Sequence, residues 1–201
     1  MPNKVLIVGA SGLVGTAAAI SFARAGWSVV AASRRRPELL DDPNIDFVAL
    51  DLQDKEACAS VCGQLKGITH VVYTAVYELP GLVDGWSDPD QIRTNGQMLE
   101  NLLVALTQSN QLNHVTLLQG TKAYGAMVGP MRVPARESQP RVEHPNFYWV
   151  QEDFLRGHAQ RHSYAFTILR PQMIVGPNHG VVMNLPPVVG VYAALRPAEG
   201  L

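Results

Sequence analysis

Short apolar runs alternate with longer amphipathic segments along the whole chain. The apolar runs are rich in β-branched and aliphatic residues, which is typical of buried strands, and the segments between them carry apolar residues at helical spacing. Six strands are predicted, over residues 5–8, 27–32, 44–50, 70–75, 114–118 and 166–169. Helices are predicted over residues 16–25, 54–65 and 90–108, from residue 146 onwards and around residue 188.

This alternation predicts the architecture, because strands joined by helices pair in parallel. We expect one α/β domain over residues 1–201, a Rossmann-type, doubly wound and mostly parallel sheet with helices on both faces. Ligands of such sheets bind beyond the carboxyl ends of the strands, so residues that follow a strand are the candidate site residues. Residues 77–89 and 126–145, rich in Gly, Pro and charged residues, are predicted to be loops beside that site.

Composition bounds the size of the core and the kinds of partner. With 201 residues, 47% of them hydrophobic and 16% charged, the chain is long enough for one globular core. The formal net charge of −1 gives no reason to expect nucleic acid or an anionic membrane as a partner. No apolar stretch reaches the roughly 18 residues of a membrane span. Met1 leads almost directly into the first strand without room for a signal peptide, so we expect a cytoplasmic protein.

The first strand runs into a glycine-rich turn. Gly9, Gly12 and Gly15 are spaced G-x-x-G-x-x-G between a strand and a helix, which is the context that a dinucleotide-binding turn requires. Gly9 reverses the chain, Gly12 admits a pyrophosphate to the backbone, and Gly15 lets helix and strand pack closely. Ser11 and Leu13, in the same turn, are also predicted to bind the cofactor at the positive helix N-terminus. The alternative is a merely structural tight turn.

The residues after the second strand predict which dinucleotide is bound. An NAD-binding unit has an acidic residue here for the ribose 2′-hydroxyl, whereas this chain has Ser33, Arg34 and Arg35. Guanidinium groups bind a 2′-phosphate that a carboxylate would repel, so we predict NADP(H), against the alternative of a solvated basic loop. The residues that follow the third and fourth strands are predicted to meet the adenine and line the cleft: Asp51, Leu52, Thr74 and Ala75.

Two further residues stand near the predicted carboxyl edge. Lys122 follows the fifth strand on the cofactor side, where it can donate a proton or stabilise an oxyanion. Tyr148 lies at the start of the next helix beside Phe147 and Trp149, and from its neighbours alone it reads as a core aromatic residue.

Other residues resemble chemical motifs without supporting one. Cys58 and Cys62 lack the spacing of a zinc or thioredoxin-type site, so we expect helix-face thiols. His158 and His162 have the spacing of zinc peptidase ligands, but Ala follows the first His where such enzymes have Glu. We therefore expect an exposed basic helix face and no metal site. Asn95 is expected to be a surface amide.

With these residues placed, the chain resembles the extended short-chain dehydrogenases/reductases, and more narrowly their progesterone 5β-reductase/iridoid synthase-like branch. The matching motifs are Gly9-x-x-Gly12-x-x-Gly15, Arg34-Arg35, Met98-Leu99-x-Asn101-Leu102, Leu118-Gln119-Gly120-x-Lys122-x-Tyr124-Gly125, Asn146-Phe147-Tyr148-x-x-x-Glu152-Asp153, Arg170-Pro171-x-x-Ile174-x-Gly176 and Met183-Asn184 with Val191-Tyr192-Ala193.

The resemblance implies an NADPH-dependent conjugate reduction of an enone or enal. Hydride goes to the β-carbon while Tyr148, aided by Lys122, hydrogen-bonds the carbonyl oxygen as it becomes enolate-like. The resemblance also implies cofactor contacts for both Tyr148 and Gln119. The remaining implied contacts are to the nicotinamide amide, from the backbone around Pro171, Met173 and Ile174.

The chain departs from this pattern in two ways. Most of the superfamily has Lys four residues after the catalytic Tyr, whereas here Glu152 stands there and would raise the phenol pKa. Extended members also continue past this length into a substrate-capping lobe. We therefore expect a domain that lacks most of that lobe and exposes apolar residues 183–195, which favours contact with a partner or a homodimer.

Two alternatives stay open beside the reductase. One is a sugar-nucleotide epimerase or dehydratase of the same fold, disfavoured because those enzymes keep Tyr-x-x-x-Lys. The other is a catalytically silent NADP(H)-binding sensor or scaffold. The substrate is a small molecule whose identity the sequence does not give.

Overall fold

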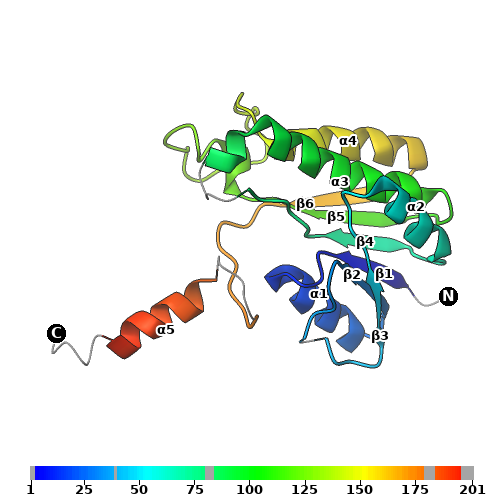
Figure 1. Ribbon diagram of the computed structural model, residues 1–201. Helices are drawn as coiled ribbons and strands as arrows, with labels where there is room; N and C mark the ends of the chain where they lie inside the picture. Colours follow the sequence, from blue (N-terminus) through cyan, green and yellow to red (C-terminus); the bar gives the residue numbers. More distant parts are fainter. Residues whose placement is uncertain (1–2, 39, 80–83, 179–183, 196–201) are drawn as a thin grey trace.

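The computed structural model describes residues 3–38, 40–79, 84–178 and 184–195. Its strands form one six-stranded sheet in the order β3-β2-β1-β4-β5-β6, and every pair is parallel (Figure 1). Their bounds are β1 Lys4–Val8, β2 Ser28–Ser33, β3 Ile45–Ala49, β4 His70–Tyr73, β5 His114–Leu118 and β6 Ala165–Leu169. The strand order reverses between β1 and β4, which places a ligand crevice at their carboxyl ends. The predicted doubly wound α/β fold is confirmed.

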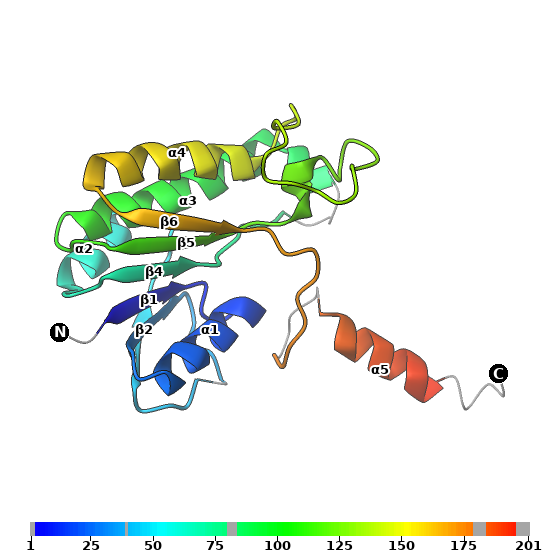
Figure 2. The same ribbon diagram turned by 180° about the vertical axis from the view of Figure 1, so that it is seen from behind.

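Helices cover both faces of this sheet. Figures 1 and 2 show α1 (Leu13–Arg24) on one face, and α2 (Lys55–Gln64), α3 (Pro89–Thr107) and α4 (Phe147–His162) on the other. Short 3₁₀ helices, η1 (Asp84–Ser87) and η2 (Thr121–Tyr124), precede α3 and follow β5.

Side chains of β1 alternate between two cores, as the period of a strand requires. Leu6 and Val8 belong to the larger core under α2, α3 and α4, whereas Val5 and Ile7 belong to the smaller core under α1. All four are almost completely buried. A central strand apolar on both faces therefore gives the continuous hydrophobic run seen in the sequence.

The predicted element bounds hold closely, with one informative difference. Helix α1 begins at Leu13 rather than Thr16, because Gly12 has extended backbone (φ −82°, ψ 167°) and serves as the N-cap. Gly15 therefore lies in the first turn of α1, where a small residue is needed. Helix α3 has a side-chain N-cap: the Asp88 carboxylate accepts from the Asp90 and Gln91 N–H groups at 2.8 and 2.9 Å.

Asn95 is completely buried, so the prediction of a surface amide is wrong. Its side chain accepts from the Tyr77 N–H at 2.9 Å and donates to the Tyr77 carbonyl at 2.8 Å. Nearby, Gln91 accepts from the Leu79 N–H at 2.7 Å. The segment that leaves β4 has no strand partner for these backbone groups, and buried amides of α3 supply one.

The predicted exposed basic helix face holds for Arg156, Arg161 and His162 but not for His158. It is 2% exposed, and its Nδ1 lies 2.8 Å from the Tyr164 hydroxyl. Burial, with the nearby positive charges of His162 and Arg161, lowers the pKa of His158 to about 4. Within the described residues, no cluster of three or more His, Cys, Asp or Glu side chains could hold a metal ion.

The two thiols lie in the core rather than at the surface of α2. Cys58 and Cys62 are both completely buried and unbridged. Burial raises the pKa of Cys58 to about 12 and that of Cys62 to about 11, so both remain protonated and unreactive.

Helix α5 (Leu185–Leu195) lies apart from the sheet, beyond its carboxyl edge (Figures 1 and 2). Its large apolar side chains are exposed, Val188 and Val191 by 61% each. Met183 lies outside the described residues. Among the helices that the structure describes, none is both long and apolar enough to cross a membrane.

Candidate active site

Two of the three glycines of the turn, Gly9 and Gly15, are required by close contacts. Gly9 has φ +83°, and a Cβ there would lie 2.7 Å from the Ala75 nitrogen and 2.8 Å from Thr74 Oγ1. A Cβ on Gly15 would overlap the Gly9 carbonyl. The Gly12 N–H donates to that same carbonyl at 2.9 Å. The turn is therefore compact, and its backbone is open to a ligand.

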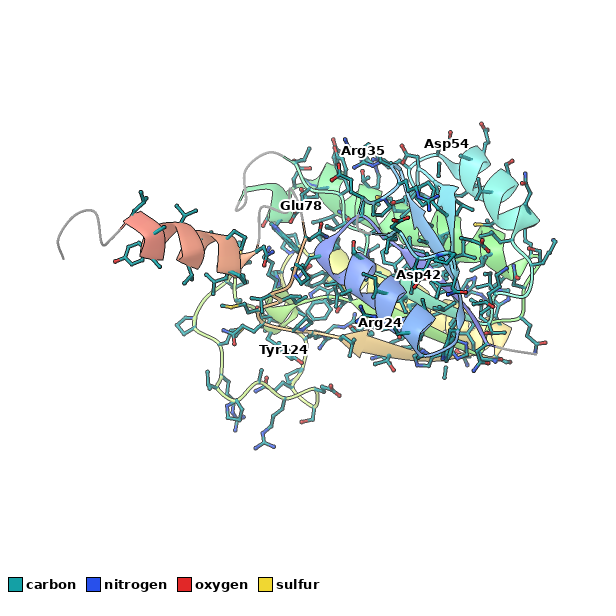
Figure 3. The ribbon with its side chains drawn as sticks, turned by 90° about the horizontal axis from the view of Figure 1, so that it is seen from below. Arg24, Arg35, Asp42, Asp54, Glu78 and Tyr124 are labelled. Atoms are coloured by element: carbon teal, nitrogen blue, oxygen red, sulfur yellow. The ribbon has the colours of Figure 1, made fainter. Side chains whose placement is uncertain are left out.

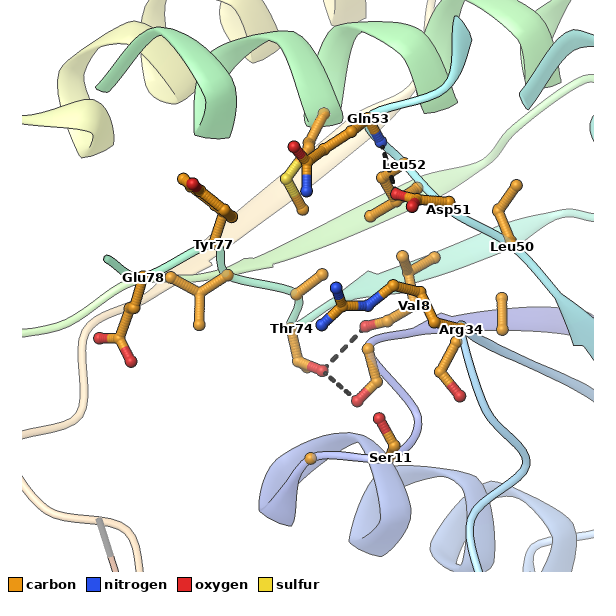
Figure 4. A pocket seen from close by; sticks show the side chains of 17 residues that line it. Val8, Ser11, Arg34, Leu50, Asp51, Leu52, Gln53, Thr74, Tyr77 and Glu78 are labelled. Atoms are coloured by element: carbon orange, nitrogen blue, oxygen red, sulfur yellow. Dashed lines mark hydrogen bonds between the residues drawn. The ribbon is translucent and has the colours of Figure 1, made fainter. Parts of the chain in front are cut away.

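Two threonine hydroxyls fix the turn from either side. Thr74, at the end of β4, donates to the Val8 carbonyl at 2.8 Å, and its Oγ1 lies 3.4 Å from the Gly9 carbonyl oxygen (Figure 4). Thr16, in α1, donates to the Ala10 carbonyl at 2.8 Å. No acidic residue lies in the first turn of α1, so its positive end carries no competing carboxylate.

A cavity of about 330 Å³ opens beside this turn. Many of the predicted cofactor residues line it: Gly9, Ser11, Gly12, Ser33, Arg34, Asp51, Leu52, Thr74 and Ala75. Figure 4 shows the Arg34 guanidinium extending across the cavity toward Thr74. Asp51 lies above it, where its carboxylate accepts from the Gln53 N–H at 3.0 Å.

Some predicted cofactor residues lie outside this cavity. Leu13 packs behind the turn against Gly176, whereas the Arg35 side chain is exposed. Figure 3 places Arg35 and Tyr124 at opposite margins of the molecule. Met173 is 64% exposed. The others outside the cavity are Gly15, Gln119, Tyr148, Pro171 and Ile174.

The segment after β6 nevertheless returns to the glycine turn. Asn178 Nδ2 lies 3.4 Å from Thr16 Oγ1 and 3.5 Å from the Ser11 carbonyl oxygen. Residues 171–176 therefore run along the carboxyl edge of the sheet, between β6 and α1.

Several lining residues were not named as site residues, although Tyr77 and Glu78 belong to the loop predicted beside the site. Gln53, Val76, Tyr77, Glu78 and Met98 also line the cavity. Gln53 and residues 76–78 follow strand ends, so the rule that identified Thr74 could have found them. Met98 belongs to the larger core and also reaches the cavity, which the helical spacing of α3 alone does not show.

Trp86 brings Lys122 and Tyr148 to one place. The Lys122 ammonium lies 2.9 Å from the centroid of the Trp86 ring, a cation–π contact. The same indole stacks on Phe147 at 4.8 Å and meets Tyr148 edge-on at 5.5 Å. Trp86 is 8% exposed. It lies in a stretch predicted to be an irregular loop, and no local pattern pointed to it.

Asn146 ties the same two residues through the backbone. Its carboxamide oxygen accepts from the Tyr148 N–H at 3.0 Å and so caps α4. Its Nδ2 lies 3.3 Å from the Lys122 carbonyl. The hydroxyl of Tyr148 faces Gly120, where a Cβ would lie 3.2 Å from it.

Burial sets the protonation of both groups. It lowers the pKa of Lys122 to about 8, although the negative charge of Glu78 opposes the shift. Burial, aided by Glu78, raises the pKa of the Tyr148 phenol above its ordinary value. At neutral pH the phenol is therefore a hydrogen-bond donor and Lys122 is mostly charged.

Glu152, predicted to raise the phenol pKa, belongs instead to an arginine cluster. Its carboxyl is bound by Arg141, Arg156 and Arg170. Burial favours the neutral acid, but hydrogen bonds from Arg156 and the charges of the other two arginines hold the pKa of Glu152 below its usual value. The carboxylate is thus neutralised by its neighbours.

The fold and the glycine turn at the strand-order reversal define a dinucleotide-binding α/β protein. Residues 5–189 match the family described as "NAD dependent epimerase/dehydratase family". The chain therefore belongs to this family.

Sequence relatives narrow the comparison. The chain is 33% identical over 214 residues to a "3-oxo-Delta(4,5)-steroid 5-beta-reductase" of Arabidopsis thaliana, covering 98% of this chain and 53% of the relative. It is 29% identical over 206 residues to an "(S)-8-oxocitronellyl enol synthase" of Catharanthus roseus, covering 96% of this chain and 50% of the relative. The chain spans about half the length of the curated relatives it matches.

Solved structures share the fold. The Bordetella bronchiseptica enzyme WbmH in complex with NAD+ has a TM-score of 0.71 at 25% identity, covering 100% of this chain and 64% of that one. The Thermus thermophilus UDP-glucose 4-epimerase complex with NAD has a TM-score of 0.74 at 20% identity, covering 94% of this chain and 61% of that one.

Proposed function

We propose that the chain binds NADP(H) and reduces the activated C=C bond of a small enone or enal. One observation carries this proposal: Lys122 and Tyr148 meet at Trp86, at the same carboxyl edge of the sheet as the glycine turn. The names of the relatives agree. A 3-oxo-Δ4,5 steroid is an enone, and an enol is what conjugate reduction of an enal forms first.

The glycine turn fits a pyrophosphate. Gly9 and Gly15 are needed where Cβ atoms would collide with the turn, Gly12 leaves the backbone bare beside the cavity, and the N-terminus of α1 faces this space. Asp51 and Leu52 line the cavity beyond the turn, which supports the predicted adenine end there. A nicotinamide dinucleotide agrees with the family of the chain and with its solved structural neighbours.

Arg34 supports NADP(H) over NAD(H). Its guanidinium lies in the cavity wall after β2, next to Ser33, and no described acidic side chain is paired with it. A phosphate on the ribose 2′ position can bind such a group in bidentate fashion. Arg35 adds positive charge at this end from the surface.

The residues divide the chemistry between them. A bound NADPH supplies one hydride to the β-carbon. The electron pair of the C=C bond would then form a double bond between the α-carbon and the carbonyl carbon, while the π pair of the carbonyl moves onto its oxygen. This gives an enolate, whose α-carbon takes a proton from water to complete the reduction. Tyr148, protonated at neutral pH, donates to the enolate oxygen, and the charged Lys122 nearby stabilises the negative charge.

NADPH oxidation tests this proposal. The chain, incubated with NADPH and either cyclohexenone or an open-chain enal, should consume one NADPH for each C=C bond reduced. Tyr148→Phe and Lys122→Met should each lower kcat by about a hundredfold or more while NADPH still binds. NADPH binding without turnover of any enone or enal would instead support the silent sensor or scaffold. Full turnover by both variants would reject the assigned roles.

An epimerase or dehydratase of the same fold is less well supported. Such enzymes have Lys four residues after the tyrosine, whereas this chain has Glu152 there, and its carboxylate is paired with three arginines. The homodimer stays a prediction, with the exposed apolar side chains of α5 as the surface to test.

A further inference from the structure

The carboxylate of Glu152 is a buried hub. Its side chain is only 5% exposed. Oε2 accepts from Arg170 at 2.6 Å, while Oε1 accepts from Arg156 at 2.8 and 3.0 Å and pairs with Arg141 at 3.3 Å. A buried carboxylate so bound is costly to disturb, because removing its charge leaves arginines without their counter-ion.

Arg170 links Glu152 to a second buried residue, Gln119. Its side chain is 16% exposed and follows β6 directly. Nη2 binds Glu152, while Nε lies 3.3 Å from Gln119 Oε1. The rings of Tyr124 and Trp149 contact the guanidinium at 5.1 and 5.6 Å. Its position is therefore fixed on several sides.

Gln119 in turn binds the backbone of α4, the helix that carries Tyr148. Its Nε2 donates to the Tyr148 carbonyl at 2.9 Å, and its backbone N–H donates to the Leu169 carbonyl at 2.8 Å. We call Glu152, Arg170 and Gln119 the tie, because together they join α4 to the ends of β5 and β6.

The tie ends where the proposed chemistry occurs. Gln119 directly precedes Gly120, whose missing Cβ leaves room for the Tyr148 hydroxyl and, at 3.6 Å, the Pro171 carbonyl. A small shift of α4 against β5 would therefore move the phenol relative to Lys122 and the cofactor edge. Displacements of about 1 Å can cost a hundredfold in rate.

We propose that Glu152, Arg170 and Gln119 are positioning residues that hold the Tyr148 end of α4 in register with β5 and β6. Glu152 occupies the fourth position after the tyrosine as the anchor of this tie and not as a group that titrates the phenol. This inference rests on the proposed function for its kinetic consequence, but not for its structural one.

Two variants and one control test the tie by kinetics. Glu152→Gln and Gln119→Met should each lower kcat by about tenfold to a hundredfold. Glu152 is not among the predicted cofactor contacts, so Glu152→Gln should also change the Kd for NADPH by less than about twofold. Asp153→Asn should leave kcat unchanged, because Asp153 is 62% exposed and, among the described residues, its ion pair is with Arg141. The double variant Glu152→Gln/Gln119→Met should lower kcat no more than the more damaging single substitution does, because both substitutions disrupt the same set of hydrogen bonds.

A second measurement does not depend on turnover. The rate of Lys122 acylation, followed by peptide mass spectrometry against pH, should have its midpoint near 8 in the parent chain. In Glu152→Gln and Gln119→Met the midpoint should rise toward 10.5 as α4 loosens and water reaches the amine. Asp153→Asn should keep the parent midpoint.

The outcomes separate the two proposals. If the parent chain reduces no enone but the Lys122 acylation midpoint rises in the variants, the reductase proposal would be rejected and the tie would stand. Parent values of both kcat and midpoint in Gln119→Met would overturn the tie, and this variant decides the question if Glu152→Gln does not fold. Additive losses in the double variant would also overturn it.

Discussion

At the residue scale, buried polar side chains hold this site by binding backbone groups. Thr74 holds the glycine turn, Asn95 holds the segment after β4, and Asn146 joins α4 to η2. Each such bond fixes a segment that has left the regular sheet, and the two bonds of Asn95 also pair the backbone N–H and carbonyl of Tyr77, which have no strand partner. The site is thus preorganised before any ligand arrives.

Arg34 should determine the preference between dinucleotides. Arg34→Ala should weaken NADPH binding by about tenfold or more and change NADH binding by less than about twofold, because only NADPH carries the 2′-phosphate. Titration of intrinsic fluorescence with each dinucleotide measures both constants. The exposed Arg24, at the end of α1, provides the control. Equal losses for both dinucleotides would contradict this role.

Lys122 should give the reaction an alkaline limit. Its pKa of about 8 means that the ammonium is present below that pH and lost above it. If its charge stabilises the enolate, kcat/KM should fall as pH rises through about 8. Lys122→Arg, which stays charged, should lack this limb over pH ~6–10. The same limb in the arginine variant would assign it to another group.

At the element scale, the close approach of α3 and α4 decides where Tyr148 lies. A Cβ on Gly96 of α3 would come within 2.6 Å of Val150 Cγ1 on α4. Val150 lies two residues after Tyr148. The missing Cβ of Gly96 therefore allows α3 and α4 to pack closely beside the proposed proton donor. Helix propensity alone would favour alanine at this position.

Two glycine substitutions should therefore have opposite signs. Gly96→Ala should lower the free energy of unfolding by about 1–3 kcal/mol through overpacking against Val150. Gly157→Ala, in α4, should raise it by about 0.5–1 kcal/mol, because its new Cβ would meet only the Arg161 guanidinium, at 3.4 Å. Urea unfolding measures both. Gly96→Ala combined with Val150→Ala should recover most of the loss, and no recovery would place the strain elsewhere.

At the scale of the whole molecule, the cavity beside the glycine turn lies at the carboxyl edge of the sheet. Its lining comes from the ends of β1, β2 and β4 and from the segment after β3, with Met98 of α3 above it. A ligand there contacts the carboxyl ends of three strands and residues of the larger core such as Val8 and Met98, so its binding energy stabilises the folded sheet. Ligand binding and unfolding are therefore linked.

NADPH should stabilise the entire domain. At about 100 times its Kd it should raise the free energy of unfolding by roughly 2.7 kcal/mol. Gly9→Ala should lower stability and remove this gain, because φ is +83° and the new Cβ meets Ala75. Gly67→Ala is the matched control: its φ is +73° with no atom within 4 Å of the new Cβ, so it should lose stability yet keep the gain. Thermal unfolding with and without NADPH distinguishes them.

The sequence by itself determined the parallel α/β fold and the residues that line the end of the cavity where we propose the cofactor binds. Both depend on local signals: the spacing of apolar residues, the glycines between β1 and α1, and the residues that directly follow each strand. Arg34, Asp51 and Thr74 could be placed in this way, because the carboxyl ends of parallel strands meet at one edge whatever the details of packing.

The family resemblance named Lys122 and Tyr148, but only the tertiary structure decided how the proposed catalytic end is arranged. Trp86 beside Lys122 and Tyr148, the arginines around Glu152 and the buried Asn95 all depend on contacts between residues distant in the chain. Such contacts follow from how helices seat on a sheet, which side-chain periodicity does not specify. A tyrosine at the start of an amphipathic helix reads as core until the packing shows what its hydroxyl faces.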